Sequence, residues 1–118
     1  MGLSTHVLDT MHGCPAAGMR VSFQRLLDGS PSQPLREFVL NADGRNPEGP
    51  VVAGENWERG QYRLSFHVGQ YFAAKGVSLP DPAFLDVVHL DFGVAQPSSH
   101  YHVPLLVSPW SYSTYRGS

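Results

Sequence analysis

The hydrophobic and polar positions of the chain alternate most regularly over residues 100–107. Every second side chain there is apolar, from Tyr101 to Val107, so these side chains would share one face of an extended strand. The opposite face would carry two imidazoles, a proline and a leucine: His100, His102, Pro104 and Leu106. The pattern therefore predicts a strand with one face in the core and two histidines outside it.

The alternation resumes after Ser108-Pro109, a pair of residues that favours a turn. Over residues 111–115 it places Tyr115 on one side together with two serines. We therefore expect a second strand here. The two strands would hold His102 and Tyr115 for a purpose other than packing.

Shorter alternating stretches predict further strands in the rest of the chain. They cover residues 3–8, 18–27, 35–41, 58–67 and 84–92, and turn-forming Gly, Pro, Asp and Ser separate them. In the first of these strands His6 points away from Val7, because successive side chains face opposite sides. About seven or eight short strands, spaced roughly 8 to 12 residues apart, are typical of a two-sheet antiparallel β-sandwich.

One segment has the spacing of a helix. Within residues 67–75, Tyr71, Phe72 and Lys75 lie three or four positions apart, and Gly76 follows as a natural stop. We therefore expect an all-β fold, a sandwich of about eight strands with one short helix. A chain of 118 residues would form it as a single domain over residues 1–118.

Composition and charge exclude several classes of protein. Eight basic residues stand against ten acidic ones without a concentrated basic stripe, which argues against a nucleic-acid partner. No stretch approaches the roughly 20 apolar residues that cross a bilayer, and no basic leader precedes an apolar run at the start. The one cysteine, Cys14, forms no intrachain disulfide. We therefore expect a cytoplasmic protein without a membrane partner.

The histidines raise the question of a metal site. His100 and His102 form a His-x-His pair on one strand face, and neutral imidazoles bind zinc well. Zinc needs further ligands, however, and neither a cysteine pair nor a glutamate accompanies this pair. Three further histidines, His12, His67 and His89, fall in loops or on polar faces. We therefore expect neither a metal nor another cofactor.

Covalent catalysis finds little support. Cys14 stands between Gly13 and Pro15 without a nearby base, which favours the role of a small buried turn residue. The serines near the end of the sequence lack the Gly-x-Ser-x-Gly elbow of serine hydrolases.

A third arrangement needs no nucleophile from the protein. Two histidines, an arginine and a tyrosine together could activate water and hold a polarised carbonyl group. The candidates are His6, His102 and Arg45, the last being the one cation of a loop over residues 41–50. Because they lie far apart in the sequence, their spacing leaves open whether they form a site or lie scattered on the surface.

Five short strings narrow the choice. They are residues 3–10 (LSTHVLDT), 13–16 (GCPA), 41–45 (NADGR), 100–106 (HYHVPLL) and 115–118 (YRGS). Through these strings the sequence resembles the 5-hydroxyisourate hydrolases, the transthyretin-related proteins, over essentially its whole length.

The resemblance implies a transthyretin-like sandwich that assembles as a homotetramer. It also implies an activity, the hydrolysis of 5-hydroxyisourate to 2-oxo-4-hydroxy-4-carboxy-5-ureidoimidazoline in urate degradation. The first-strand histidine of the family corresponds to His6, its loop arginine to Arg45, and the second histidine of His-x-His to His102. The tetrapeptide at residues 115–118 supplies Tyr115 and Ser118.

These correspondences suggest a mechanism. We hypothesise that His6 and His102 orient and deprotonate a water molecule, which attacks the lactam carbonyl of the substrate. Arg45 would hold the polar edge of the substrate and stabilise the developing oxyanion. Tyr115 and Ser118 would shape and close the pocket, which two subunits would build at their interface.

Two other classes of function stay open. Transthyretin binds hormone in the channel of the same fold, and the fold alone does not separate a carrier from an enzyme. A carrier needs a roomy apolar channel, whereas His6, His102 and Tyr115 would narrow the channel and line it with polar groups. A passive immunoglobulin-like module is the other class, but the sequence lacks the pair of cysteines that packs against a buried tryptophan in that fold.

Overall fold

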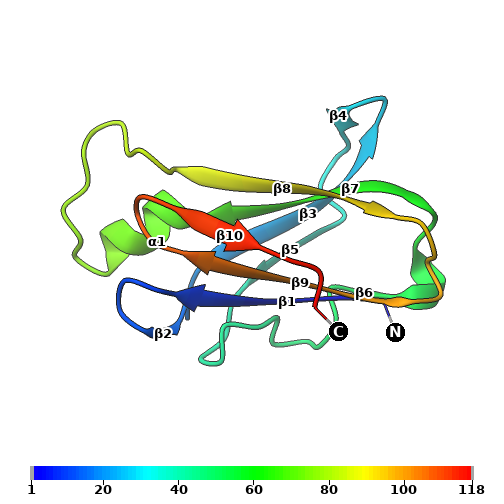
Figure 1. The fold of residues 1–118 in the computed structure, drawn as a ribbon, viewed down its shortest axis with the longest axis horizontal. Helices are drawn as coiled ribbons and strands as arrows, with labels where there is room; N and C mark the ends of the chain where they lie inside the picture. The colour runs from blue at the N-terminus through cyan, green and yellow to red at the C-terminus, as the bar shows by residue number, and fades with distance from the viewer. Residues whose placement is uncertain (1, 118) are drawn as a thin grey trace.

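The computed structural model describes residues 2–117, which form two packed β-sheets (Figure 1). The strands of the first sheet are β1 (Gly2–Asp9), β2 (Cys14–Pro15), β6 (Val52–Ala53), β9 (His100–Val107) and β10 (Tyr112–Thr114). Those of the second are β3 (Arg20–Leu27), β4 (Ser30–Pro31), β5 (Arg36–Val39), β7 (Gly60–His67) and β8 (Val87–Val94). Between β7 and β8 lies the helix α1 (Val68–Ala74), and a 3₁₀ turn, η1 (Gly54–Asn56), follows β6.

The two-sheet sandwich with one short helix confirms the predicted fold class. The helix covers all but the two end residues of the predicted segment 67–75, and Gly76 follows it with the positive φ of 83° that suits a residue ending a helix. Two strands of two residues each, β2 and β4, lie in segments that were expected to be a loop and a turn, and a third, β6, lies where no strand was expected. Two residues are too few to produce an alternation that a sequence pattern can reveal.

The direction of one strand pair corrects the expectation of purely antiparallel sheets. Strand β1 pairs with β9 in parallel over eight residues, whereas the other strand pairs of residues 2–117 are antiparallel. Alternation assigns each side chain to a face, but it carries no information on strand direction. The chain reaches β9 from β8 in the other sheet, and so it can enter the first sheet from either end.

The core lies between the sheets and follows the predicted alternation. In β9 the inward side chains of Tyr101, Val103, Leu105 and Val107 are at most 7% exposed. The inward residues of β3, β7 and β8 face them and are buried as well: Val21, Phe23, Tyr62, Leu64, Phe66, Val88 and Leu90. Burial of these large side chains, at roughly 1.5–3 kcal/mol each, holds the two sheets together.

The parallel pairing fixes which residues of β1 and β9 are neighbours. Ser4 lies opposite His102, and His6 lies opposite Pro104. Strand β10 extends the same sheet on the far side of β9, and an isolated bridge joins Gly117 to His102 beyond the end of β10. Figure 1 shows β1, β9 and β10 side by side in this sheet.

Candidate functional site

Polar side chains gather on the outer face of the first sheet. Ser4 and His6 of β1 alternate with the buried residues Leu3, Thr5 and Val7 and therefore point away from the core. His100 and His102 of β9 lie on this same outer face, because opposite residues in paired strands face the same side. Two of the candidate residues, His6 and His102, are thus neighbours on adjacent strands.

A tight turn brings Arg45 to the same strand. The Asn41 side chain accepts hydrogen bonds from the backbone N–H groups of Asp43, at 2.9 Å, and of Arg45, at 3.1 Å. Gly44 takes a φ of 73° in this turn, and its carbonyl accepts a hydrogen bond from the Val7 N–H at 3.0 Å. The turn is therefore attached to β1 at the residue that follows His6.

Close packing makes glycine necessary in this turn. A Cβ atom at Gly44 would stand 2.6 Å from the carbonyl oxygen of Val7, and a positive φ is unfavourable for other residues. Local packing therefore explains why the NADGR string has a glycine at position 44: it lets the loop that carries Arg45 approach β1.

The pKa of His102 is influenced by the two other candidate residues, His6 and Arg45. Partial burial lowers the pKa of His102 most, and the positive charge of Arg45 lowers it further, as do His100 and His6. These groups are close enough to influence one another. An imidazole with a lowered pKa is neutral near neutral pH, so His102 has a free ring nitrogen that can accept a proton.

A serine that the sequence analysis did not select joins the two histidines of β9. The Ser4 hydroxyl lies 2.8 Å from Nδ1 of His102 and 3.1 Å from Nε2 of His100. Alternation alone places Ser4 on the same face of β1 as His6. Its contact with His102, however, depends on the register between β1 and β9, which no sequence pattern reveals.

The segment after β10 covers one side of His102. The N–H of Gly117 donates to the His102 carbonyl at 2.8 Å, and a Cβ atom at Gly117 would meet the imidazole Cδ2 at 2.6 Å. Tyr115 lies between the pairs Thr114–Leu105 and Gly117–His102, which places it opposite Pro104 by register. Its side chain is 60% exposed. Ser118 lies outside the described residues.

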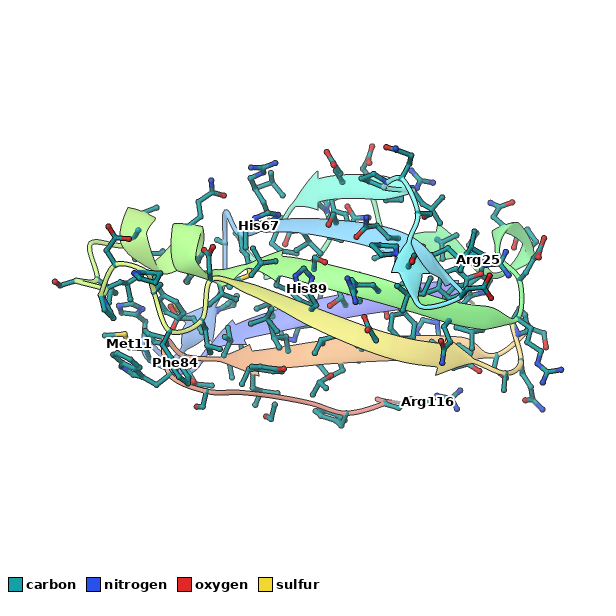
Figure 2. All side chains as sticks on the ribbon, turned by 90° about the horizontal axis from the view of Figure 1, so that it is seen from above. Met11, Arg25, His67, Phe84, His89 and Arg116 are labelled. Atoms are coloured by element: carbon teal, nitrogen blue, oxygen red, sulfur yellow. The ribbon has the colours of Figure 1, made fainter. Side chains whose placement is uncertain are left out.

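Three other histidines lie away from this face. Figure 2 shows His67 and His89 on the second sheet, where Nδ1 of His89 lies 2.8 Å from the Ser65 hydroxyl. His12 pairs with the buried carboxylate of Asp9. Among residues 2–117 no group of three or more His, Cys, Asp or Glu side chains has an arrangement that could hold a metal ion.

The candidate face is open. A groove of about 550 Å³ lies at the edge between the sheets, where Phe92 of β8, Tyr112 of β10 and the candidate residue Tyr115 are among the residues that line it. His6, Arg45 and His102 are not among the residues that line this groove. Arg45 is exposed, and His6 and His102 are partly exposed on the outer face of the first sheet. No helix of residues 2–117 has the length and apolar character needed to cross a membrane.

Comparison with known proteins extends these observations. The model of the HIUase/Transthyretin family matches residues 3–117. A curated 5-hydroxyisourate hydrolase of Ralstonia nicotianae is 55% identical over 116 residues, which is 98% of this chain and 97% of that protein.

Two solved structures share the fold. The crystal structure of an (S)-allantoin synthase matches with a TM-score of 0.91 and 50% identity over 99% of this chain, which spans only 43% of that longer protein. Sea bream transthyretin in complex with thyroxine matches with a TM-score of 0.82 and 28% identity, over 99% of this chain and 95% of that one. The chain therefore belongs to the HIUase/Transthyretin family.

Proposed function

We propose that this protein hydrolyses 5-hydroxyisourate to 2-oxo-4-hydroxy-4-carboxy-5-ureidoimidazoline, a step of urate degradation. The observation that carries the proposal is the arrangement around His102. An imidazole with a lowered pKa lies on one open face with His6 and under the influence of Arg45. The relative that is 55% identical over nearly the whole chain, and is named a 5-hydroxyisourate hydrolase, supports the same reaction.

In this mechanism, His6 and His102 act on the attacking water. Together they orient it, and the neutral imidazole of His102 accepts its proton as the water oxygen bonds to the lactam carbonyl carbon. The ring C–N bond then breaks, its nitrogen takes a proton, and the carbonyl carbon becomes a carboxylate. The protein needs neither a cofactor nor a metal for this sequence of steps.

Arg45 is the electrostatic partner in the mechanism. Its guanidinium carries a permanent charge and a planar set of donors, which suits a substrate carbonyl that becomes an oxyanion. The attachment of the Arg45 turn to Val7 of β1 supports this role, because it keeps the arginine next to the strand that carries His6. Tyr115 and Ser118 would bind and enclose the substrate.

The proposal includes a homotetramer in which the sites lie at subunit interfaces. The open outer face supports it, since water would have free access to the reacting groups in a single chain. Exposed aromatic side chains support it as well: Phe84, Trp110 and Tyr115 are each at least 60% exposed. Light scattering after size-exclusion chromatography tests it, and a monomer that retains full activity would overturn it.

A carrier of iodothyronines is the second candidate, because the chain shares its fold with a transthyretin whose structure holds thyroxine. The imidazoles and the serine on the outer face favour the enzyme, since they place polar groups where a carrier would need apolar surface. The lower identity to that transthyretin, 28% against 55% for the hydrolase, favours the enzyme too.

One assay separates the two candidates. The absorbance of freshly generated 5-hydroxyisourate is followed over time with and without the protein. We expect a rate that rises in proportion to protein concentration. Thyroxine binding, measured by calorimetry on the same sample, should be absent or far weaker. Tight thyroxine binding without accelerated decay would reverse the assignment.

The proposal also covers the domain boundaries and the cellular compartment of the protein. We expect residues 1–118 to act as one hydrolase domain, and the free thiol of Cys14 is compatible with the reducing cytoplasm. Activity of the purified chain and fractionation of the native cells test these two points.

A further inference from the structure

One hydroxyl group lies between two imidazoles on the outer face of the first sheet. Ser4 Oγ is 2.8 Å from Nδ1 of His102 and 3.1 Å from Nε2 of His100. Both distances fall within hydrogen-bonding range. Ser4 lies directly opposite His102 in the parallel ladder, and His100 precedes it by two residues on the same face of β9. The three groups therefore form a continuous chain of contacts.

The number of protons limits how this chain can be arranged. A serine hydroxyl has a single proton to donate, so it donates to at most one of the two imidazoles, and when its proton lies between them it accepts from the other. In one arrangement Nδ1–H of His102 donates to Ser4, and Ser4 donates to Nε2 of His100. In the reverse arrangement Ser4 donates to Nδ1 of His102. A neutral imidazole then carries its proton on Nε2 and has no free nitrogen on its exposed side.

Of the two arrangements in which Ser4 donates to a histidine, the first suits the mechanism. It leaves a lone pair on Nε2 of His102, the nitrogen that does not contact Ser4. The shorter of the two contacts, 2.8 Å against 3.1 Å, is the one to His102. Burial and then the charges of Arg45, His100 and His6 lower the pKa of His102, whereas its hydrogen bonding to the Ser4 backbone raises it. This backbone group is distinct from the Ser4 hydroxyl, so the direction of the hydroxyl contact rests on the geometry and the mechanism alone.

We propose that Ser4 is a positioning residue, which holds His102 in the Nδ1–H form through the relay His102 Nδ1–H to Ser4 Oγ and Ser4 Oγ–H to His100 Nε2. The proposal rests on the hydrolase function assigned above. Nε2 of His102 is then the atom that takes the proton of the attacking water. Gly117 supports the arrangement from the other side, since its backbone packs against the imidazole and limits its rotation.

The hydroxyl of Ser4 is not needed to hold the fold together. The side chain of Ser4 is on the outer face and only partly buried, whereas the packing of β1 comes from its inward residues Leu3 and Val7. The backbone of Ser4 belongs to the β1–β9 ladder and does not depend on its hydroxyl. Removal of the hydroxyl should therefore leave the fold intact and change only the state of His102.

Kinetics provide the first test. Ser4→Ala should lower kcat roughly tenfold to a hundredfold with little change in KM, because a fraction of His102 then carries its proton on the wrong nitrogen. Ser4→Thr keeps a hydroxyl on the β-strand and should restore most of the activity. Ser98→Ala removes an exposed serine from the loop before β9 and is the matched control, with kcat unchanged.

Nitrogen NMR on protein with isotope-labelled histidine provides the second test and does not depend on turnover. The His102 signals are identified by their loss in His102→Asn. In the wild type we expect a protonated Nδ1 and an unprotonated Nε2, whereas Ser4→Ala and His100→Ala should each show a mixture of the two forms. Ser4→Thr should again show the wild-type pattern.

The possible outcomes distinguish this proposal from the proposed function. If the wild type hydrolyses 5-hydroxyisourate and Ser4→Ala does so equally fast, the relay is wrong and the function stands. If the wild type is inactive but the NMR pattern is as expected, the hydrolase function fails while the relay remains. A wild-type His102 with its proton on Nε2 would overturn the relay whatever the activity.

Discussion

Asp9 carries a carboxylate into the sandwich, where its side chain is completely buried. The Tyr71 hydroxyl donates to its Oδ2 at 2.8 Å, and the His12 backbone N–H donates to its Oδ1 at 2.9 Å. Burial raises the pKa of Asp9, but the hydrogen bonds from His12 and Tyr71 outweigh burial and lower it below its ordinary value. The carboxylate thus connects the turn after β1 with helix α1.

Replacement of this carboxylate should therefore destabilise the protein. Asp9→Asn places an amide where the His12 N–H, the His12 ring and the Tyr71 hydroxyl all point, which should cost roughly 1–3 kcal/mol of unfolding free energy at neutral pH. Because its folded-state pKa is lowered, the carboxylate stabilises the fold above its unfolded-state value of about 3.9 and loses this effect as the pH falls through the folded-state pKa.

Urea unfolding at neutral and acidic pH measures both effects. The difference between wild type and Asp9→Asn should shrink as the pH falls. Asp28→Asn is the control, since this aspartate is exposed in the turn between β3 and β4 and its replacement should change stability by less than about 0.5 kcal/mol. A difference for Asp9→Asn that does not depend on pH would contradict the account of Asp9.

His102 is the second residue whose replacement is informative. His102→Asn removes the proposed proton acceptor and should slow turnover by roughly a hundredfold or more, the scale of a lost acid/base group. The assembly should stay intact. His67→Asn, which changes a histidine of the second sheet, should leave turnover unchanged (Figure 2). Equal rates for His102→Asn and the wild type would remove His102 from the mechanism.

Among the elements, the turn over residues 41–45 has the strictest local requirement. Gly44 and Gly29 both adopt a positive φ, of 73° and 80°. A Cβ atom at Gly44 would clash with the Val7 carbonyl, whereas one at Gly29 would find no atom within 4 Å. A substitution at Gly29 would strain the backbone only, whereas one at Gly44 would also displace the loop that carries Arg45. Comparison of the two positions therefore separates these effects.

Alanine at the two positions should give different results. Each substitution should cost roughly 1–2 kcal/mol for the left-handed backbone. Gly44→Ala should in addition move the turn away from β1 and lower kcat/KM at least tenfold, because Arg45 loses its place beside His6. Thermal unfolding and steady-state kinetics measure the two effects. Similar losses of activity in both variants would show that the position of the turn is unimportant.

Prediction from the sequence succeeded where a strand is long enough to show alternation. The inward and outward faces of β1, β3, β7 and β9 follow from their patterns, as do the helix and its end before Gly76. The two-residue strands and the parallel direction of β1 and β9 did not follow, because neither leaves a periodic signal.

The candidate site was predictable only in part from the sequence. The strings that resemble the hydrolase family supplied His6, Arg45, His102, Tyr115 and Ser118, and their roles remain predictions. Ser4 was missed, because its place between His100 and His102 depends on pairing between strands nearly a hundred residues apart. Alternation identifies the face on which a side chain lies, whereas its neighbours on that face depend on register.

At the scale of the whole molecule, exposed apolar side chains from separate loops meet at one end of the sandwich. The rings of Phe84 and Trp110 lie 6.0 Å apart and are 68% and 60% exposed. Figure 2 shows Met11, itself 52% exposed, at the same end as Phe84. Exposed apolar side chains of this kind are a place where the proposed tetramer would bury apolar surface.

Polar replacements at this end should therefore weaken the assembly. We expect the double variant Phe84→Ser and Trp110→Ser to dissociate into smaller species at micromolar concentration, and to lose activity in proportion if the sites need two subunits. Leu27→Ser is the control, because Leu27 is 56% exposed at the end of β3, in the second sheet. Analytical ultracentrifugation with parallel activity assays tests this, and full activity in the dissociated variant would exclude interfacial sites.

The parallel pair of β1 and β9 has a consequence for the order of events during synthesis. Ser4 leaves the ribosome long before His102, which is 98 residues further along the chain, so the first strand emerges without the neighbour that later fills its edge. Contacts over such distances in sequence form slowly. A nascent chain interrupted before β9 would hold His6 and Arg45 but no partner for them. The proposed site would thus be complete only once translation has passed β9.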